Sequence, residues 1–194
     1  MKFAIFSAVM FGCMLSFFSL QAHAQRDYFT DEEIEMVRDA QATDSRIDVL
    51  THAIDRRFSV LNVNTADPTV RRKDADKWGP LPTGSRLELL SDIRYILQKA
   101  IDDIDNLADN PKAAHIPFED EKKPKDPSAL FPTAVRKLAA AAGRYEPALK
   151  SQLEISKDPQ EKATIIDSIE LCDEIIASVS KLPAEAPKKS GKGH

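Results

Sequence analysis

Residues 85–109 read SRLELLSDIRYILQKAIDDIDNLAD, and this stretch decides the fold class. Its apolar residues recur at spacings of three and four, which is the period of an α-helix that buries one face. Pro82-Thr83-Gly84-Ser85 precedes the pattern and Asn110-Pro111 ends it, so a helix is predicted between these two segments. Six of its residues fall within about 40° of one line at about 100° per residue: Leu90, Ile93, Leu97, Ile101, Ile104 and Ala108.

An earlier stretch shows the same period and begins at Thr30. Acidic residues follow in the first turn, where they favour the helix dipole, and Glu33 completes a capping box with Thr30. The segment Thr43-Asp44-Ser45 interrupts the apolar line, so we expect a kink or a brief break there. The line itself contains Ile34, Val37, Ala40, Ile47, Leu50, Ile54, Phe58 and Leu61.

Two later stretches complete the pattern. The third helix is predicted to begin between Asp126 and Pro132, and Gly143 and Pro147 predict a bend within it. The fourth begins at Asp158-Pro159-Gln160-Glu161, which combines an N-cap, a first-turn proline and a capping-box glutamate. The apolar line of the third helix contains Val135, Leu138, Ala142, Tyr145, Leu149 and Leu153, and that of the fourth contains Ile165, Ile169, Cys172, Ile176 and Val179.

Apolar residues almost nowhere alternate with the period of two that is typical of strands, so the predicted fold class is all-α. Four amphipathic helices bury their apolar faces most simply in an antiparallel four-helix bundle, here with a kinked first helix. The connection at 156–158 is tight, which makes the last two helices an antiparallel hairpin. The connections at about 63–84 and 110–127 are long, and long loops are functional or mobile.

The first 24 residues are typical of a secretory signal peptide. Lys2 is followed by an apolar run to Leu20 and by the small-residue site Ala22-His23-Ala24, so we expect cleavage before Gln25 and a periplasmic or secreted protein. An uncleaved membrane anchor is an alternative, and lipid attachment at Cys13 is a weaker one. Residues 25–182 then form one helical-bundle domain, and 183–194, rich in Pro, Lys and Gly, form a disordered tail.

The composition of the cleaved chain limits its stabilising bonds and partners. Its 170 residues carry 26 basic and 31 acidic side chains, a formal charge of −5, which argues against a nucleic-acid partner. Cleavage also removes Cys13 and leaves Cys172 as the only thiol, so an intramolecular disulfide is excluded and stability must come from packing.

Several sequence segments resemble uncharacterised exported all-helical proteins of bacteria. The segments are Tyr28 to Ile34, Arg38 to Gln41, Arg46 to Asp48, Ala134 to Leu138 and the helix start at Asp158-Pro159. The resemblance implies an all-helical fold over most of the cleaved chain. It implies no activity, cofactor or catalytic residue.

No cofactor or enzymatic activity is predicted. Di-iron bundles need Glu-x-x-His pairs, c-type haem needs the motif Cys-x-x-Cys-His, and the cleaved chain contains neither pattern. Cys172 lies in an apolar line, where a thiol is unreactive, and no nucleophile elbow or phosphate-binding loop is present. Asp48, His52 and Asp55 share one helical face that could bind a divalent ion, but a solvated polar face explains them fully, and this second interpretation is favoured.

The segment Val70-Arg71-Arg72-Lys73-Asp74-Ala75-Asp76-Lys77-Trp78-Gly79-Pro80 is the most distinctive non-helical stretch. An exposed aromatic side chain among cations can bind an anionic envelope component or an acidic protein, so a binding surface is predicted. Alternatively Trp78 covers the open end of the bundle, which is the interpretation that we favour. The residues of the candidate surface are Arg71, Arg72, Lys73, Lys77 and Trp78.

Two functional hypotheses follow from this sequence. The first is an exported, non-enzymatic protein that acts through contacts with another protein or with an anionic envelope component, with no stable transmembrane segment after cleavage. The second is a periplasmic carrier of a small ligand or metal that uses a cavity between helices.

Overall fold

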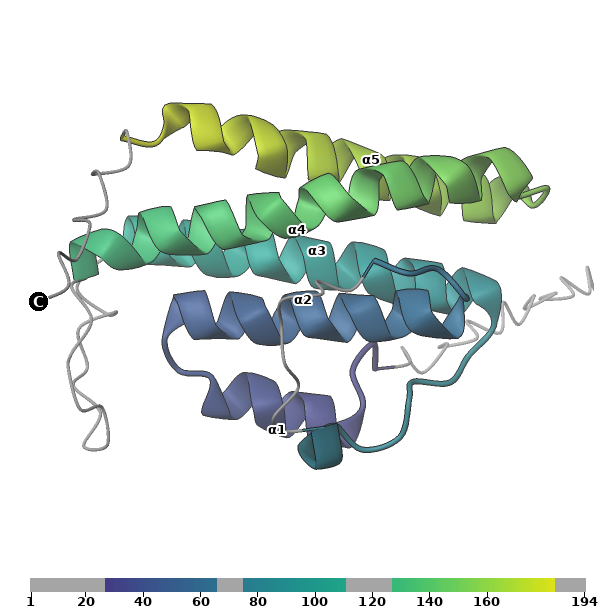
Figure 1. Cartoon of the computed structure of the whole chain (residues 1–194), viewed down its shortest axis with the longest axis horizontal. Helices are drawn as coiled ribbons and strands as arrows, with labels where there is room; N and C mark the ends of the chain where they lie inside the picture. Colours follow the sequence, from purple (N-terminus) through teal and green to yellow (C-terminus); the bar gives the residue numbers. More distant parts are fainter. Residues whose placement is uncertain (1–26, 66–74, 111–126, 184–194) are drawn as a thin grey trace, which may run out of the picture.

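A computed structural model describes residues 27–65, 75–110 and 127–183. Within these ranges the chain is all-helical and contains no strand (Figure 1). The predicted signal peptide, the predicted tail beyond residue 183, and Arg71, Arg72 and Lys73 lie outside the described residues. The all-α fold class predicted from the sequence is therefore confirmed for the described part of the chain.

Five α-helices and two short 3-10 helices make up the described residues. They are α1 (Asp31–Asp39), α2 (Thr43–Val60), η1 (Ala75–Trp78), α3 (Arg86–Asp109), α4 (Pro127–Ile155), α5 (Pro159–Ser178) and η3 (Val179–Lys181). The predicted helix that follows Pro82-Thr83-Gly84-Ser85 is confirmed as α3. Helix α4 continues through Pro132 and Pro147.

The four long helices, α2 to α5, lie side by side along the long axis of the molecule (Figure 1). Helix α2 packs against α3 and α4, and α5 packs against the same two helices from the other side. Helix α1 lies on α2, and η1 lies next to α1. The core between the helices consists of aliphatic side chains with Phe58, Tyr145 and Cys172.

The first predicted helix forms two helices, because α1 ends at Asp39 and α2 begins at Thr43. The predicted capping box at the start of α1 is confirmed. The Thr30 hydroxyl accepts from the Glu33 backbone N–H at 3.3 Å, and the Glu33 carboxylate accepts from the Thr30 N–H at 3.1 Å. Glu33 nevertheless has a second set of partners, which are described below.

The N-cap predicted for α5 is confirmed, since the Asp158 carboxylate accepts from the backbone N–H groups of Gln160 and Glu161. The carboxylate of Glu161, which the sequence assigns to a capping box, has different partners. It accepts from Arg86 Nε at 3.0 Å and from the Ser156 hydroxyl at 2.6 Å. Glu161 therefore joins the start of α5 to α3 and to the preceding turn.

The buried residues of α5 follow the predicted apolar line as far as Cys172 and differ from it beyond that residue. Ile165 and Cys172 are fully buried as predicted, but Ile176 is 36% exposed and Ile175 is buried instead. Ser168 is also buried on this face of α5, and its hydroxyl donates a hydrogen bond to the Thr164 carbonyl at 2.8 Å, which satisfies it away from water.

No helix among the described residues is long and apolar enough to span a bilayer.

Candidate functional site

Four charged side chains meet inside the fold where α1, α2 and α3 come together, and we call Glu33, Arg56, Arg57 and Asp92 the ionic cluster. Glu33 is 0% exposed, Arg57 1% and Arg56 4%. The two oxygens of the Glu33 carboxylate accept from Arg57 Nη1 at 2.6 Å and Nη2 at 2.7 Å, and Oε1 also accepts from Arg56 Nη1 at 2.8 Å. Arg57 Nε lies 3.6 Å from an Asp92 carboxylate oxygen.

The two arginines of the ionic cluster also bind backbone carbonyls. Arg57 donates to the carbonyls of Tyr28 at 2.5 Å and Ala53 at 2.8 Å, and Arg56 donates to those of Gly79 at 3.3 Å and of Pro80. Buried charges are tolerated when they are paired and hydrogen-bonded in this way. The cluster therefore fastens the chain before α1 and the chain after η1 onto α2.

The chemistry available to the ionic cluster is limited by these contacts. Burial lowers the pKa of Arg56, while the carboxylate of Glu33 partly offsets that effect. The Glu33 carboxylate already has four donors within hydrogen-bond distance, so it has no free oxygen lone pair aimed at a substrate. We conclude that the cluster stabilises the fold.

Trp78, from the predicted binding surface, packs on the side of α2. Its ring lies edge-on to the His52 ring, with centroids 4.2 Å apart, and the Arg56 guanidinium carbon lies 5.5 Å from the Trp78 ring centroid. Such cation–π geometry is favourable in partly buried sites. Trp78 is half-buried, so it covers apolar surface, but it lies on α2 next to α1 and not on the open end of the helices. Its neighbour Lys77 is exposed.

The three weak metal candidates have separate partners. Asp48 is exposed and pairs with Lys137 of α4, whereas His52 is half-buried against Trp78. Asp55 is buried, accepts from the Thr65 hydroxyl at 2.9 Å and lies 3.9 Å from Arg144 Nη2. The prediction of a solvated face is therefore wrong for Asp55, because α4 covers this side of α2.

Residues 27–65, 75–110 and 127–183 contain no group of three His, Cys, Asp or Glu side chains that could hold a metal ion.

Two buried side chains carry groups that are reactive in other settings. Cys172 is buried, as the sequence predicts, and burial followed by the nearby carboxylates of Glu146 and Asp173 raises the pKa of its thiol to about 12. Burial, and then the charge of Asp55, raises the pKa of Tyr145 well above its usual value, and the Tyr145 hydroxyl donates to the Thr51 carbonyl at 2.9 Å. Neither group is a nucleophile at neutral pH.

A cavity of about 250 Å³ lies between the C-terminal half of α3, the first turns of α4 and the end of α5. Its wall is aliphatic and aromatic: Ile101, Ile104, Phe131, Val135, Leu138, Ile175 and Leu182. Its polar lining consists of Asp105, Glu174, Ser178 and Lys181, of which the three charged side chains are exposed. An apolar wall with a few polar groups at one side is the usual construction of a small-molecule site.

The ionic cluster was not predicted from the sequence, and a cavity between helices was predicted only within the carrier hypothesis, without its residues. Arg56 and Arg57 are adjacent in the sequence and lie 23 and 24 residues from Glu33, which is not a spacing that marks any local motif. Ile101, Ile104, Val135 and Leu138 of the cavity wall were predicted as core residues, whereas Phe131, Ile175 and Leu182 were not. The chain matches no protein-family model, no curated protein and no solved structure.

Proposed function

We propose that this chain is an exported, non-enzymatic helical protein that binds a small ligand in the cavity between α3, α4 and α5. In this proposal the helices α2 to α5 form an antiparallel four-helix bundle, and the signal peptide is removed before Gln25. The ligand is held by non-covalent contacts with the cavity wall, whose lining includes neither Cys172 nor Tyr145.

The cavity is the observation that supports this proposal. Protein interiors are packed about as densely as organic crystals, and voids larger than a water molecule are few. The space of about 250 Å³ is partly open to solvent, and its largely apolar wall is surface that a small ligand would cover. Its position between helices is one at which bundles place ligand sites.

Methyl NMR of the full chain tests the proposal with the neutral probe 2-phenylethanol. Saturable shifts of the methyl signals of Ile101, Ile104 and Leu138 are expected, because these side chains line the cavity. Ile155 supplies the control, since it is 64% exposed at the far end of α4 and should not shift. Unchanged cavity signals at millimolar probe would refute the proposal.

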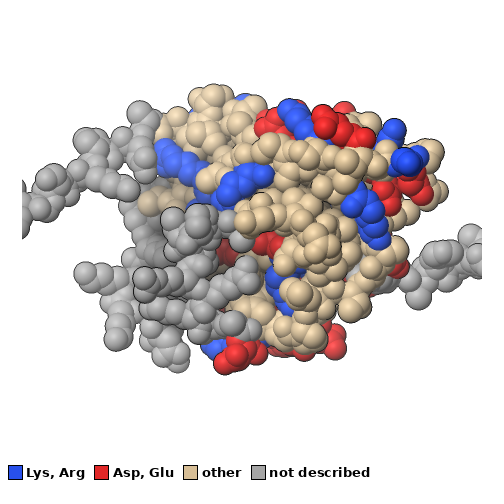
Figure 2. Space-filling model, turned by 45° about the vertical axis from the view of Figure 1, so that its right-hand side comes forward, with Lys and Arg blue, Asp and Glu red and all other residues tan. Residues whose placement is uncertain are grey.

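A second candidate function is contact with an acidic protein or an anionic envelope component through the segment around Trp78. It is supported by the exposure of Lys77 and by Leu81, which is 52% exposed. On the face drawn in Figure 2, however, acidic and basic side chains lie next to one another and do not form a large patch of one sign. Co-sedimentation with anionic vesicles, compared between the unchanged chain and Lys77→Ala with Leu81→Ser, tests this candidate.

A further inference from the structure

We infer that the cavity selects a small organic cation, namely a protonated amine on an apolar body that carries one ring or a short hydrocarbon chain. This inference rests on the proposed function and adds the chemical class of the ligand. It follows from three observations, which are the volume of the cavity, the charges at its rim and the hydrogen-bond acceptors there that have no partner among the described residues.

The volume limits the body of the ligand. An apolar cavity of about 150 Å³ in another protein binds benzene. The present cavity of about 250 Å³ therefore accommodates one six-membered ring with a tail of two or three atoms. Phe131 and the aliphatic side chains of its wall provide contacts for such a body but no hydrogen bonds.

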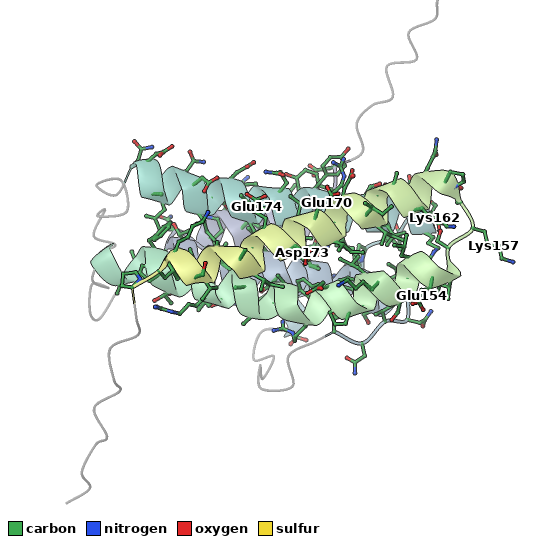
Figure 3. All side chains as sticks on the ribbon, turned by 90° about the horizontal axis from the view of Figure 1, so that it is seen from above. Glu154, Lys157, Lys162, Glu170, Asp173 and Glu174 are labelled. Atoms are coloured by element: carbon green, nitrogen blue, oxygen red, sulfur yellow. The ribbon has the colours of Figure 1, made fainter. Side chains whose placement is uncertain are left out.

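The charges at the rim favour a cation. Among the described residues that line the cavity, Asp105 of α3 and Glu174 of α5 supply two carboxylates, and Lys181 supplies one ammonium group. Figure 3 shows Glu174 and Glu170 on the α3 side of α5, with Asp173 nearer α4. In the described part of the chain, neither Asp105 nor Glu174 has an ion-pair or hydrogen-bond partner. As far as the described residues go, both carboxylates are therefore available to a ligand.

The helix ends add to the same preference. Helices α3 and α5 both end near the cavity, at Asp109 and Ser178, and α4 begins there. A helix C-terminus carries a partial negative charge and an N-terminus a partial positive one. The two C-termini, of α3 and α5, therefore outweigh the one N-terminus, of α4, and favour a cation. The Ser178 hydroxyl donates its proton to the Ile175 carbonyl at 2.6 Å, so toward the cavity it can act only as an acceptor.

A protonated amine matches this arrangement better than a neutral or anionic group does. Its three N–H donors can be shared between the carboxylates of Asp105 and Glu174 and the hydroxyl oxygen of Ser178. A ligand carboxylate would instead meet two like charges at the rim. An exposed ion pair contributes about 0.2–1 kcal/mol, so two such pairs predict a preference of about two- to thirtyfold for the cation over a neutral analogue.

Calorimetric titration of the full chain with three probes of one shape tests the inference. The probes are 2-phenylethylammonium, 2-phenylethanol and phenylacetate, which share the ring and differ in charge. The expected order of affinity is cation, then alcohol, then anion, and the margin of the cation should shrink as salt is added.

Equal affinities, or tighter binding of phenylacetate, would overturn the inference while leaving the cavity as a ligand site. The absence of binding by all three probes would overturn the proposed function as well. That outcome is expected if the protein's own chain fills the cavity.

Charge-neutral variants of the rim provide the matched comparison. Asp105→Asn with Glu174→Gln should lower the affinity for the cation to that for the alcohol and leave the alcohol unchanged. Glu170→Gln removes the same charge one turn away on α5, outside the lining, and should keep most of the cation preference. These side chains are exposed, so the folded state is expected to tolerate all three changes. An undiminished preference in the double variant would refute the role of the two carboxylates.

Discussion

Replacement of Glu33 by alanine tests the ionic cluster most directly. The side chain is fully buried and accepts three hydrogen bonds of 2.6–2.8 Å from Arg56 and Arg57, in addition to the bond of 3.1 Å from the Thr30 N–H. Removing it leaves two buried guanidinium groups with only Asp92, 3.6 Å from Arg57, as a nearby acidic partner within the cluster. Breaking a buried ion pair by removing one partner costs about 3–5 kcal/mol, and the loss of the capping box acts in the same direction.

Urea denaturation followed by circular dichroism measures this loss as a change in the free energy of unfolding. For a chain of this size about 3–5 kcal/mol corresponds to a fall of roughly 6–20 °C in the melting temperature. Asp31→Ala is the matched control, because Asp31 is an exposed acid in the same first turn. It should lose only its interaction with the helix dipole, about 0.3–1 kcal/mol.

Glu33→Gln separates the charge from the shape of the side chain. The amide oxygen can still accept hydrogen bonds, but the amide nitrogen is a donor that faces the guanidinium groups and the side chain carries no charge, so most of the destabilisation should remain. A loss below about 1 kcal/mol in Glu33→Ala would contradict the argument. It would mean that the two guanidinium groups find water or other acceptors at little cost.

Two further predictions concern side chains packed against α2 and within α5. Trp78→Ala should lower the free energy of unfolding by about 2 kcal/mol, roughly half the value for a fully buried tryptophan. The fluorescence emission of Trp78 in the native protein should be blue-shifted. Red-shifted emission that iodide quenches easily would contradict the packing of Trp78 on α2. Cys172 should react slowly with thiol reagents in the native state and quickly in urea. Because burial raises the pKa of the Cys172 thiol in the folded chain, the unfolded chain loses this proton at a lower pH. The free energy of unfolding should therefore fall by about 1.4 kcal/mol per pH unit between about pH 9 and about pH 12. Cys172→Ala should remove this part of the pH dependence. An unchanged slope in this variant would refute the assignment.

The apolar periodicity of the sequence predicts the helices because burial of one face is a local property of each helix. The line from Leu90 to Ile104 lies in the core, apart from the half-buried Ile101, and Cys172 is buried where its phase places it. The same rule fails at Ile176, where Ile175 is buried instead. Periodicity predicts which side of a helix is apolar. The packing of the neighbouring helices decides whether Ile175 or Ile176 faces the core.

Hydrophobic periodicity predicts neither long-range ion pairs nor the residues that line a cavity. The sequence predicts Glu33 only as a first-turn acid of a capping box and makes no prediction for Arg56 and Arg57, which the fold brings to Glu33. A cavity is the difference between the space that the helices enclose and the volume of the side chains that fill it. That difference depends on how α3, α4 and α5 are spaced, which no single helical pattern contains.

The ionic cluster and the cavity lie on different parts of α3, and this separation is testable. Asp92 and Asp105 are 13 residues apart, which is about 20 Å along the helix. Effects of changes more than about 10 Å apart with no shared partner usually add within about 0.5 kcal/mol. Glu33→Gln combined with Glu174→Gln should therefore lose the sum of the two single stability changes, and Glu33→Gln alone should leave the affinity for 2-phenylethylammonium unchanged below its melting temperature. An altered affinity in that variant would show that the cluster sets the spacing of the helices around the cavity.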